Sequence, residues 1–152
     1  MTLTRQAKPR PGRSGLLALA AGCAVACALA FGPSAQAQTA NQVMFCSDAN
    51  FKGKCFTVDK GGGNVNLTQK SFPGGGNWND KISSVKVGAN VRVLAYENTN
   101  WTGECIVFSG ANVGGRTKGE YPNLTGYETS VGNSWNDRIS SYQTGGSSYV
   151  CP

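Results

Sequence analysis

Trp78-Asn79-Asp80-Lys81-Ile82-Ser83-Ser84 and Trp135-Asn136-Asp137-Arg138-Ile139-Ser140-Ser141 are two copies of one seven-residue stretch. Six of the seven positions are identical, and the seventh exchanges Lys81 for Arg138, which keeps the charge. The two copies lie 57 residues apart. A match of this density in a short chain indicates one structural unit used twice.

Each copy holds an Asn-Asp pair followed by a Ser-Ser pair, so oxygen-bearing side chains recur in equivalent surroundings. Oxygen ligands of this kind suit a hard cation such as calcium. A second interpretation needs no metal. Asn-Asp can begin a turn, and the serines can hydrogen-bond to nearby backbone.

The N-terminal part of the chain is typical of a secretory signal peptide. Residues 1–15 carry four basic residues and no acid, residues 16–31 are almost entirely apolar, and Ala35-Gln36-Ala37 offers a cleavage site. This order predicts a signal peptide over residues 1–37 and a single domain over residues 38–152. We therefore expect a secreted or periplasmic protein. Acylation at Cys23 is an alternative, which Ala20 disfavours because a bulkier apolar residue is usual there.

The basic character of the chain belongs mainly to this signal. The whole chain has a net charge of +6, but the part after residue 37 has ten basic and eight acidic residues, a net charge of +2. No run of Lys and Arg remains in this part, so nucleic acid is not an expected partner. No later apolar stretch approaches the length of a membrane span, so we expect no membrane anchor after signal removal.

Four cysteines follow the signal, and an even number in an exported chain predicts two disulfides. Three pairings are possible. The spacing of Cys46 and Cys55 fits facing positions on a hairpin, which favours that bond and leaves Cys105 with Cys151. The second bond would tie the tail, residues 144–152, to the rest of the domain.

The mature sequence has no helical period, because Gly, Asn, Ser and Thr interrupt every window. Short runs rich in β-formers appear instead, joined by Gly-rich loops. Many short strands of this kind predict an all-β sandwich or barrel. The predicted strands are residues 43–46, 55–58, 83–87, 91–96, 105–108 and 139–142.

The repeat extends upstream of the opening motif. Asn50-Phe51-Lys52-Gly53-Lys54-Cys55 matches Asn100-Trp101-Thr102-Gly103-Glu104-Cys105. A Gly at a fixed place after an aromatic residue suggests a positive φ, or close packing of the ring on the backbone that a Cβ would block. Each repeat then supplies four strands, so the sequence predicts two Greek keys in one sandwich.

These residues resemble the βγ-crystallins in their small exported microbial form. That family has two signatures, an aromatic-x4-aromatic-x-Gly hairpin and an Asn/Asp-Asn/Asp-x-x-Ser/Thr-Ser motif. The second repeat carries both, at residues 96–103 and 136–141; the first carries the second signature at residues 79–84 and has Cys46 in place of the leading aromatic. The resemblance implies Greek key 1 over about residues 42–88 and Greek key 2 over about residues 91–143.

The resemblance also implies two calcium sites shared between the motifs. Ser83 and Ser140 would supply hydroxyls, and Asp80 and Asp137 would supply carboxylates across the pair. Asn79 and Asn136 would shape the loops. One carboxylate for each ion predicts weak binding, with a dissociation constant near about 10⁻⁴ M. Lys81 and Arg138 follow the aspartates and would weaken binding further if their cations lie over the sites.

The sequence gives little support to catalysis. The chain contains no histidine, so the commonest general base is missing. Asp80 and Asp137 could be a glycosidase-like carboxylate pair, but their Ser-rich surroundings suit a cation better. Trp78 and Trp135 could stack on a ligand, although we expect both rings to fill the core, as aromatic rings mostly do. Phe51 and Trp101 are expected to pack in their hairpins. We expect no enzyme activity.

A second hypothesis is binding to a protein target. The chain resembles exported metalloprotease inhibitors and killer-toxin-like proteins of this fold in size, signal and disulfides. The second repeat has about seven extra residues before its Trp, in a loop that carries Arg116 and Lys118. Such a loop could present a peptide to an extracellular protease or a charged patch to a cell surface. The alternative is an ordinary long surface loop.

Overall fold

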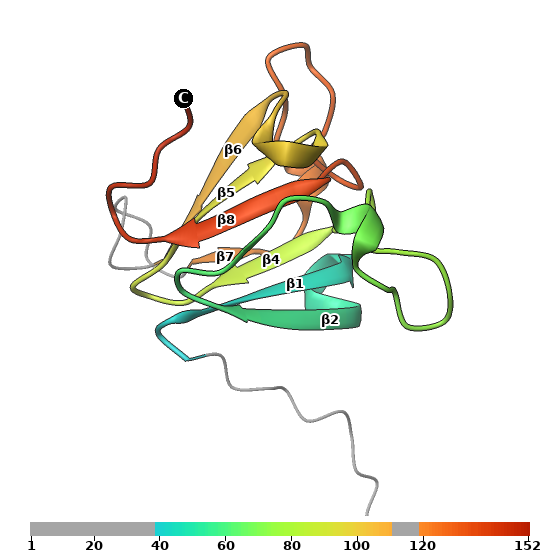
Figure 1. The fold of residues 1–152 in the computed structure, drawn as a ribbon, viewed down its shortest axis with the longest axis horizontal. Helices are drawn as coiled ribbons and strands as arrows, with labels where there is room; N and C mark the ends of the chain where they lie inside the picture. Colours follow the sequence, from blue (N-terminus) through green and yellow to red (C-terminus); the bar gives the residue numbers. More distant parts are fainter. Residues whose placement is uncertain (1–38, 111–118) are drawn as a thin grey trace, which may run out of the picture. The chain divides into compact units, whose positions relative to one another are not determined.

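The chain folds into two antiparallel four-stranded sheets, as the sequence predicts. The computed structural model describes residues 39–110 and 119–152, and the signal peptide predicted over residues 1–37 lies outside this range. Within the described residues, four short 3₁₀ turns lie between strands that Figure 1 shows. The strands are β1 Gln42–Asp48, β2 Lys52–Asp59, β3 Gly63–Asn64, β4 Ser84–Val87, β5 Arg92–Tyr96, β6 Cys105–Ser109, β7 Glu120–Tyr121 and β8 Ser141–Gly145. The 3₁₀ turns are η1 Ala49–Phe51, η2 Leu67–Gln69, η3 Thr99–Trp101 and η4 Leu124–Gly126.

Each repeat gives one strand to the sheet of the other. The sheet orders are β2-β1-β4-β7 and β3-β8-β5-β6, so β7 of the second repeat joins the first sheet and β3 of the first repeat joins the second. β3 pairs with β8 and β7 pairs with β4. The two Greek keys are therefore interlocked, and the strands that follow the two motifs, β4 and β8, lie inside their sheets.

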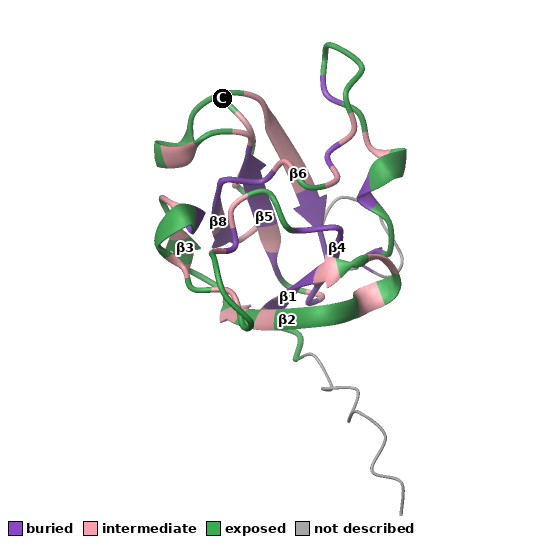
Figure 2. Ribbon diagram, turned by 90° about the vertical axis from the view of Figure 1, so that its right-hand side faces the viewer, coloured by how far each residue is buried: buried purple, intermediate pink, exposed green. Residues whose placement is uncertain are grey.

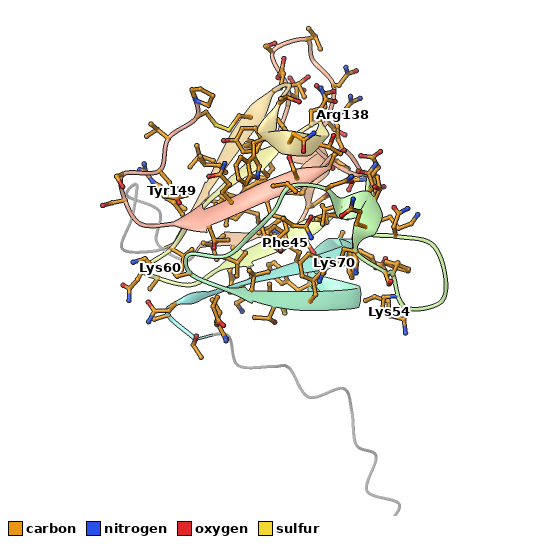
Figure 3. The ribbon with its side chains drawn as sticks, viewed as in Figure 1. Phe45, Lys54, Lys60, Lys70, Arg138 and Tyr149 are labelled. Carbon is orange, nitrogen blue, oxygen red and sulfur yellow. A yellow bond between two sulfur atoms is a disulfide. The ribbon has the colours of Figure 1, made fainter. Side chains whose placement is uncertain are left out.

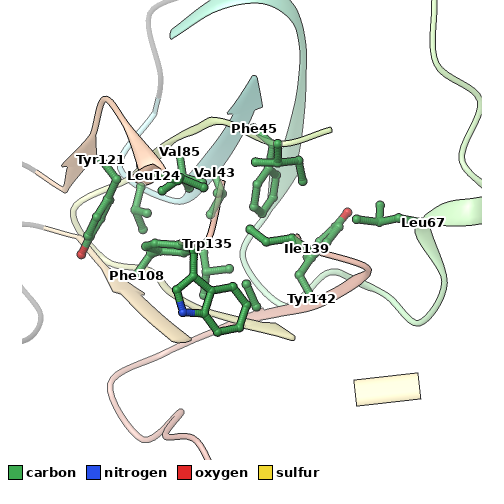
Figure 4. Packing of buried hydrophobic residues seen from close by; sticks show 14 of the residues in the cluster. Val43, Phe45, Leu67, Val85, Phe108, Tyr121, Leu124, Trp135, Ile139 and Tyr142 are labelled. Atoms are coloured by element: carbon green, nitrogen blue, oxygen red, sulfur yellow. The ribbon is translucent and has the colours of Figure 1, made fainter. Parts of the chain in front are cut away.

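The core lies between the two sheets and draws on both repeats. Val43, Phe45 and Val85 come from one sheet, and Phe108 and Tyr142 from the other; all are buried (Figure 4). The rings of Phe45 and Tyr142 lie 4.7 Å apart between the sheets. Figure 2 shows the interior strands largely buried, whereas the edge strand β2 is mostly exposed.

Trp78 and Trp135 belong to this core, as expected. Their side chains are only 2% and 1% exposed. The backbone N–H of each donates to the carbonyl of a residue eight positions earlier, at 2.9 Å for Trp78 and 2.8 Å for Trp135. The buried ring and this backbone hydrogen bond together hold the loop that leads into each motif. Neither ring is available to stack on a ligand.

The hairpins that join β1 to β2 and β5 to β6 require glycine. Gly53 and Gly103 have φ of 74° and 76°, the left-handed region that favours glycine. A Cβ on Gly103 would also lie 2.6 Å from Asn98 Nδ2. The positive φ expected from the sequence is confirmed, whereas the group that a Cβ would meet belongs to Asn98 and not to an aromatic ring. The aromatic residue before each glycine stays near the surface, however, and Trp101 remains 43% exposed.

Both expected disulfides form. Cys46 and Cys55 face each other across β1 and β2 and are bonded. Cys105 faces Tyr96 across β5 and β6, and it bonds instead to Cys151 of the C-terminal tail. The tail is also held by Arg92, whose Nη1 donates to the carbonyl oxygens of Ser147 and Tyr149 at 2.9 and 3.1 Å.

No helix within residues 39–110 and 119–152 has the length and apolar character needed to cross a membrane.

Candidate metal site

The two Trp-Asn-Asp motifs lie side by side and hold each other by reciprocal backbone bonds. Asp80 N donates to Ile139 O at 3.3 Å, and Asp137 N donates to Ile82 O at 3.1 Å. Both aspartates have φ of 53°, a left-handed conformation that asparagine and aspartate adopt more readily than most residues. The positive φ turns each loop so that its carboxylate meets the other motif.

Each aspartate is paired with the serine of the opposite motif. Ser83 Oγ donates to Asp137 Oδ1 at 3.0 Å, and Ser140 Oγ donates to Asp80 Oδ1 at 3.3 Å. The two residues of each pair are 54 and 60 positions apart in the chain. The structure therefore brings together the four side chains that the resemblance pairs across the repeats.

The asparagines orient the carboxylates. Asn79 Nδ2 donates to Asp80 Oδ2, and Asn136 Nδ2 donates to Asp137 Oδ2, both at 2.7 Å. Each carboxylate is thus held at one oxygen by its own loop and at the other by the opposite serine. Asn79 Oδ1 is buried and has no hydrogen-bond partner in the described part of the chain, so its lone pairs remain available.

The second serine of each motif has a different task. Ser84 Oγ donates to Asp48 O at 2.6 Å and accepts from Phe51 N at 3.1 Å. Ser141 Oγ does the same with Asn98 O and Trp101 N, at 2.6 and 3.1 Å. These serines fasten the hairpin turns to the motifs. The second serine of each motif thus bonds to backbone, as the metal-free interpretation expects, whereas the first bonds to a carboxylate, and neither bond requires a metal.

A polar hollow of about 330 Å³ opens at this end of the molecule. Three carboxylates and one guanidinium line it, together with a hydroxyl and an amide. The lining residues are Asp80, Glu97, Asn98, Asp137, Arg138 and Ser140. Negative charge exceeds positive charge around the hollow, which favours a cation over an anion.

Glu97 and Asn98 also line this hollow, although neither occupies a defined position of a motif that the sequence marks out. They follow β5 at the start of the hairpin, where the repeat alignment places Ser47 and Asp48 in the first repeat. Because Glu97 has no acidic counterpart there, the internal repeat gives no signal for it. Its carboxylate Oε1 lies 2.6 Å from Arg138 Nη1, beside the turn that joins β5 to β6, where Figure 3 shows Arg138.

The surroundings of Asp80 raise the pKa of its carboxyl group. Burial raises the pKa of the Asp80 carboxyl above its ordinary value, while the hydrogen bond from Ser140 and the charge of Arg138 oppose that rise. Asp137 and Glu97 raise it further by like-charge repulsion. A cation close to Asp80 would relieve both the burial cost and the repulsion.

The spacing of the Asp–Ser oxygens is compatible with a calcium ion. Two oxygens that bind one calcium ion at about 2.4 Å, at an angle of about 80°, lie about 3.1 Å apart. The Asp–Ser oxygen pairs are 3.0 and 3.3 Å apart. Within residues 39–110 and 119–152, no group of three His, Cys, Asp or Glu side chains could hold a metal ion. Hydroxyl, backbone carbonyl and water oxygens would therefore complete the shell.

The loop with Arg116 and Lys118, the expected alternative binding surface, falls outside the described residues.

The sequence pattern of the Beta/Gamma crystallin family matches residues 39–113, from the start of the first Greek key into the second. The chain belongs to the βγ-crystallin superfamily. Comparison with curated protein sequences gives no match.

Solved βγ-crystallin structures share the fold. A domain described in connection with the evolution of the eye-lens βγ-crystallin domain fold is 22% identical, with a TM-score of 0.54, over 72% of this chain and 89% of that one. A βγ-crystallin domain from Flavobacterium johnsoniae is 20% identical, with a TM-score of 0.50, over 71% of this chain and 98% of that one. The described residues thus form an all-β βγ-crystallin sandwich stapled by two disulfides.

Proposed function

We propose that this βγ-crystallin domain is a weak calcium-binding structural module without catalytic activity. The observation that supports it most directly is the pairing of each motif aspartate with the serine of the opposite motif, at 3.0 and 3.3 Å. An ion bound at such a pair would join two segments more than fifty residues apart in sequence. Calcium would then act as a removable cross-link between the two Greek keys.

The thin shell of charged ligands argues for weak binding. Each pair offers one carboxylate, one hydroxyl and the oxygens of the surrounding loops, and sites of this charge belong to the range of about 10⁻⁴ M. Extracellular fluids hold calcium at concentrations that load such sites, whereas the cytosol does not. Weak affinity is therefore compatible with function only outside the cell.

Export fits the covalent structure of the domain. The two disulfides suit an oxidising compartment. We propose that the chain is delivered to the periplasm or the exterior by the signal peptide over residues 1–37, and that calcium there stiffens the fold.

The test is the stability of the purified exported protein with and without calcium. A site with a dissociation constant of about 10⁻⁴ M, in about 10 mM calcium, adds about 2.7 kcal/mol to the free energy of unfolding. The melting temperature should therefore rise by several degrees over that measured in chelator. Magnesium at the same concentration should give a smaller rise, because it accepts irregular loop ligands poorly.

The matched variant is Ser83→Ala with Ser140→Ala, which removes both hydroxyls and keeps both carboxylates. Its melting temperature should no longer respond to calcium. Coincident melting curves of the unaltered protein in calcium and in chelator would refute the proposal. Calorimetric titration gives the affinity independently of unfolding.

A further inference from the structure

The two Asp–Ser pairs agree in geometry but differ in the cation that stands beside them. The motif residue after each aspartate is Lys81 in the first repeat and Arg138 in the second. A basic side chain at this position can fold over the carboxylates or point away from them. The described structure puts the two cations in different places.

Arg138 lies in the hollow with the Asp80–Ser140 pair. Its Nη1 atom is 2.6 Å from Glu97 Oε1, and its Nε donates to Ser134 O at 3.2 Å. The side chain is one-third exposed. Two bonds at different nitrogens fix the plane of the guanidinium, so its charge stays beside the pair instead of moving freely in solvent.

Lys81 is placed otherwise. Its Nζ atom lies 5.8 Å from the centre of the Phe72 ring, and the residue is exposed. The position that corresponds to Glu97 is Ser47, whose hydroxyl donates to Asp48 Oδ1 at 3.0 Å and accepts from Lys54 N at 3.0 Å. The first repeat thus has no carboxylate at that position to draw Lys81 toward the Asp137–Ser83 pair.

We propose that the Arg138 guanidinium supplies the positive charge beside the Asp80–Ser140 pair in place of a calcium ion. The domain then binds one calcium ion, at the Asp137–Ser83 pair. This inference rests on the proposed calcium function. A calcium ion at the Asp80–Ser140 pair would share the hollow with the anchored guanidinium, whose positive charge would repel it. Asp137 also lines this hollow, but its partner Ser83 does not, and the basic residue of that motif, Lys81, is exposed.

The two pairs then differ in calcium binding, although they come from one duplicated motif. One pair accepts calcium from solution, while the other keeps a permanent internal counter-ion. The contact between Asp80 and Ser140 would then be the same whether or not calcium is present. Only the other contact between the repeats depends on the ion.

The experiment is calorimetric titration of the mature protein, residues 38–152, with calcium chloride. It measures how many calcium ions each protein molecule binds. We expect one ion for the unaltered protein and two for Arg138→Gln. Lys81→Gln is the matched control at the equivalent position and should stay at one. Arg138→Lys, which keeps the charge, should bind fewer than two calcium ions. This variant separates the effect of losing the charge from a general change in folding.

Single hydroxyl variants locate the bound ion. Ser83→Ala should abolish binding to an otherwise unaltered chain, whereas Ser140→Ala should leave stoichiometry and affinity unchanged. Two ions of similar affinity in the unaltered protein would overturn the inference and leave the proposed function standing. One ion in Arg138→Gln would also overturn it. No binding to any of these proteins would refute the proposed function itself, and the inference with it.

Discussion

The two Greek keys share a backbone pattern and use some equivalent positions differently. Both have a buried tryptophan before the motif, an aspartate at φ of 53° and a serine that meets the other key. They diverge where Tyr96 replaces Cys46 and Glu97 replaces Ser47. The comparison teaches that the duplicated unit retains what the core and the loop backbone demand, while side chains at other positions, the buried pair Cys46 and Tyr96 included, took separate roles.

The largest effect is expected from truncating the core tryptophans. Trp78→Ala and Trp135→Ala should each lower the free energy of unfolding by about 3–5 kcal/mol, because each leaves a large cavity. Trp78 should cost more, since its ring makes edge contacts with Phe56 and Phe72 at 4.6 and 4.9 Å. The equivalent positions in the second key are Ile106 and Thr129. Urea unfolding measures the free energy of unfolding of both variants. A larger loss for Trp135→Ala would contradict the expected difference between the two keys.

The disulfides should differ next. Cys105→Ala with Cys151→Ala removes a bond that closes 46 residues, and Cys46→Ala with Cys55→Ala removes one that closes nine. Loop entropy predicts losses of about 4 and about 3 kcal/mol respectively. Guanidinium unfolding of the two double variants gives the difference. The reverse order would show that packing around Cys46, which is fully buried, outweighs loop entropy.

The hairpin serines should behave alike. Ser84→Ala and Ser141→Ala each leave one backbone N–H and one carbonyl without this partner, in part-buried surroundings. Each should lose about 1–3 kcal/mol. Thermal unfolding of the pair is the measurement, with Ser83→Ala in chelator as a nearby control. A difference above about 1 kcal/mol would mean that the two turns are not equivalent.

The smallest effect concerns pH. Tyr142 stands where the first key has Val85, and burial raises the pKa of its phenol to about 12. Between the ordinary value near pH 10 and about pH 12, the unfolded chain loses this proton while the folded chain keeps it. Stability should therefore fall as pH rises through this window, by at most about 1.4 kcal/mol for each pH unit.

Tyr142→Phe removes the titrating group and keeps the ring. The difference between its stability and that of the unaltered protein should change between pH 10 and pH 12 and be constant below pH 9, since other groups titrate equally in both. A constant difference across the whole range would contradict the assigned burial effect.

Six of the eight strands were predictable from the sequence because they contain β-rich runs. β3 and β7 were not, since Gly63–Asn64 and Glu120–Tyr121 are too short to give a pattern, and only pairing with the other repeat makes them strands. Ile139 was assigned to a strand, but it precedes β8, and its carbonyl serves the loop by accepting from Asp80 N.

The cross-motif pairs were predictable only through the family resemblance. Nothing in the spacing of Asp80 and Ser140 says that residues 60 positions apart lie 3.3 Å apart. The ion pair between Glu97 and Arg138 was not predictable from the repeat either, because Glu97 lies at a position where the two repeats differ.

The exchange of β3 and β7 makes each half of the chain incomplete by itself. A fragment ending near residue 88 would keep β3 without β8 to pair with, and β4 without β7 on its flank. A chain that has been made only as far as residue 88 therefore has neither of the two sheets complete.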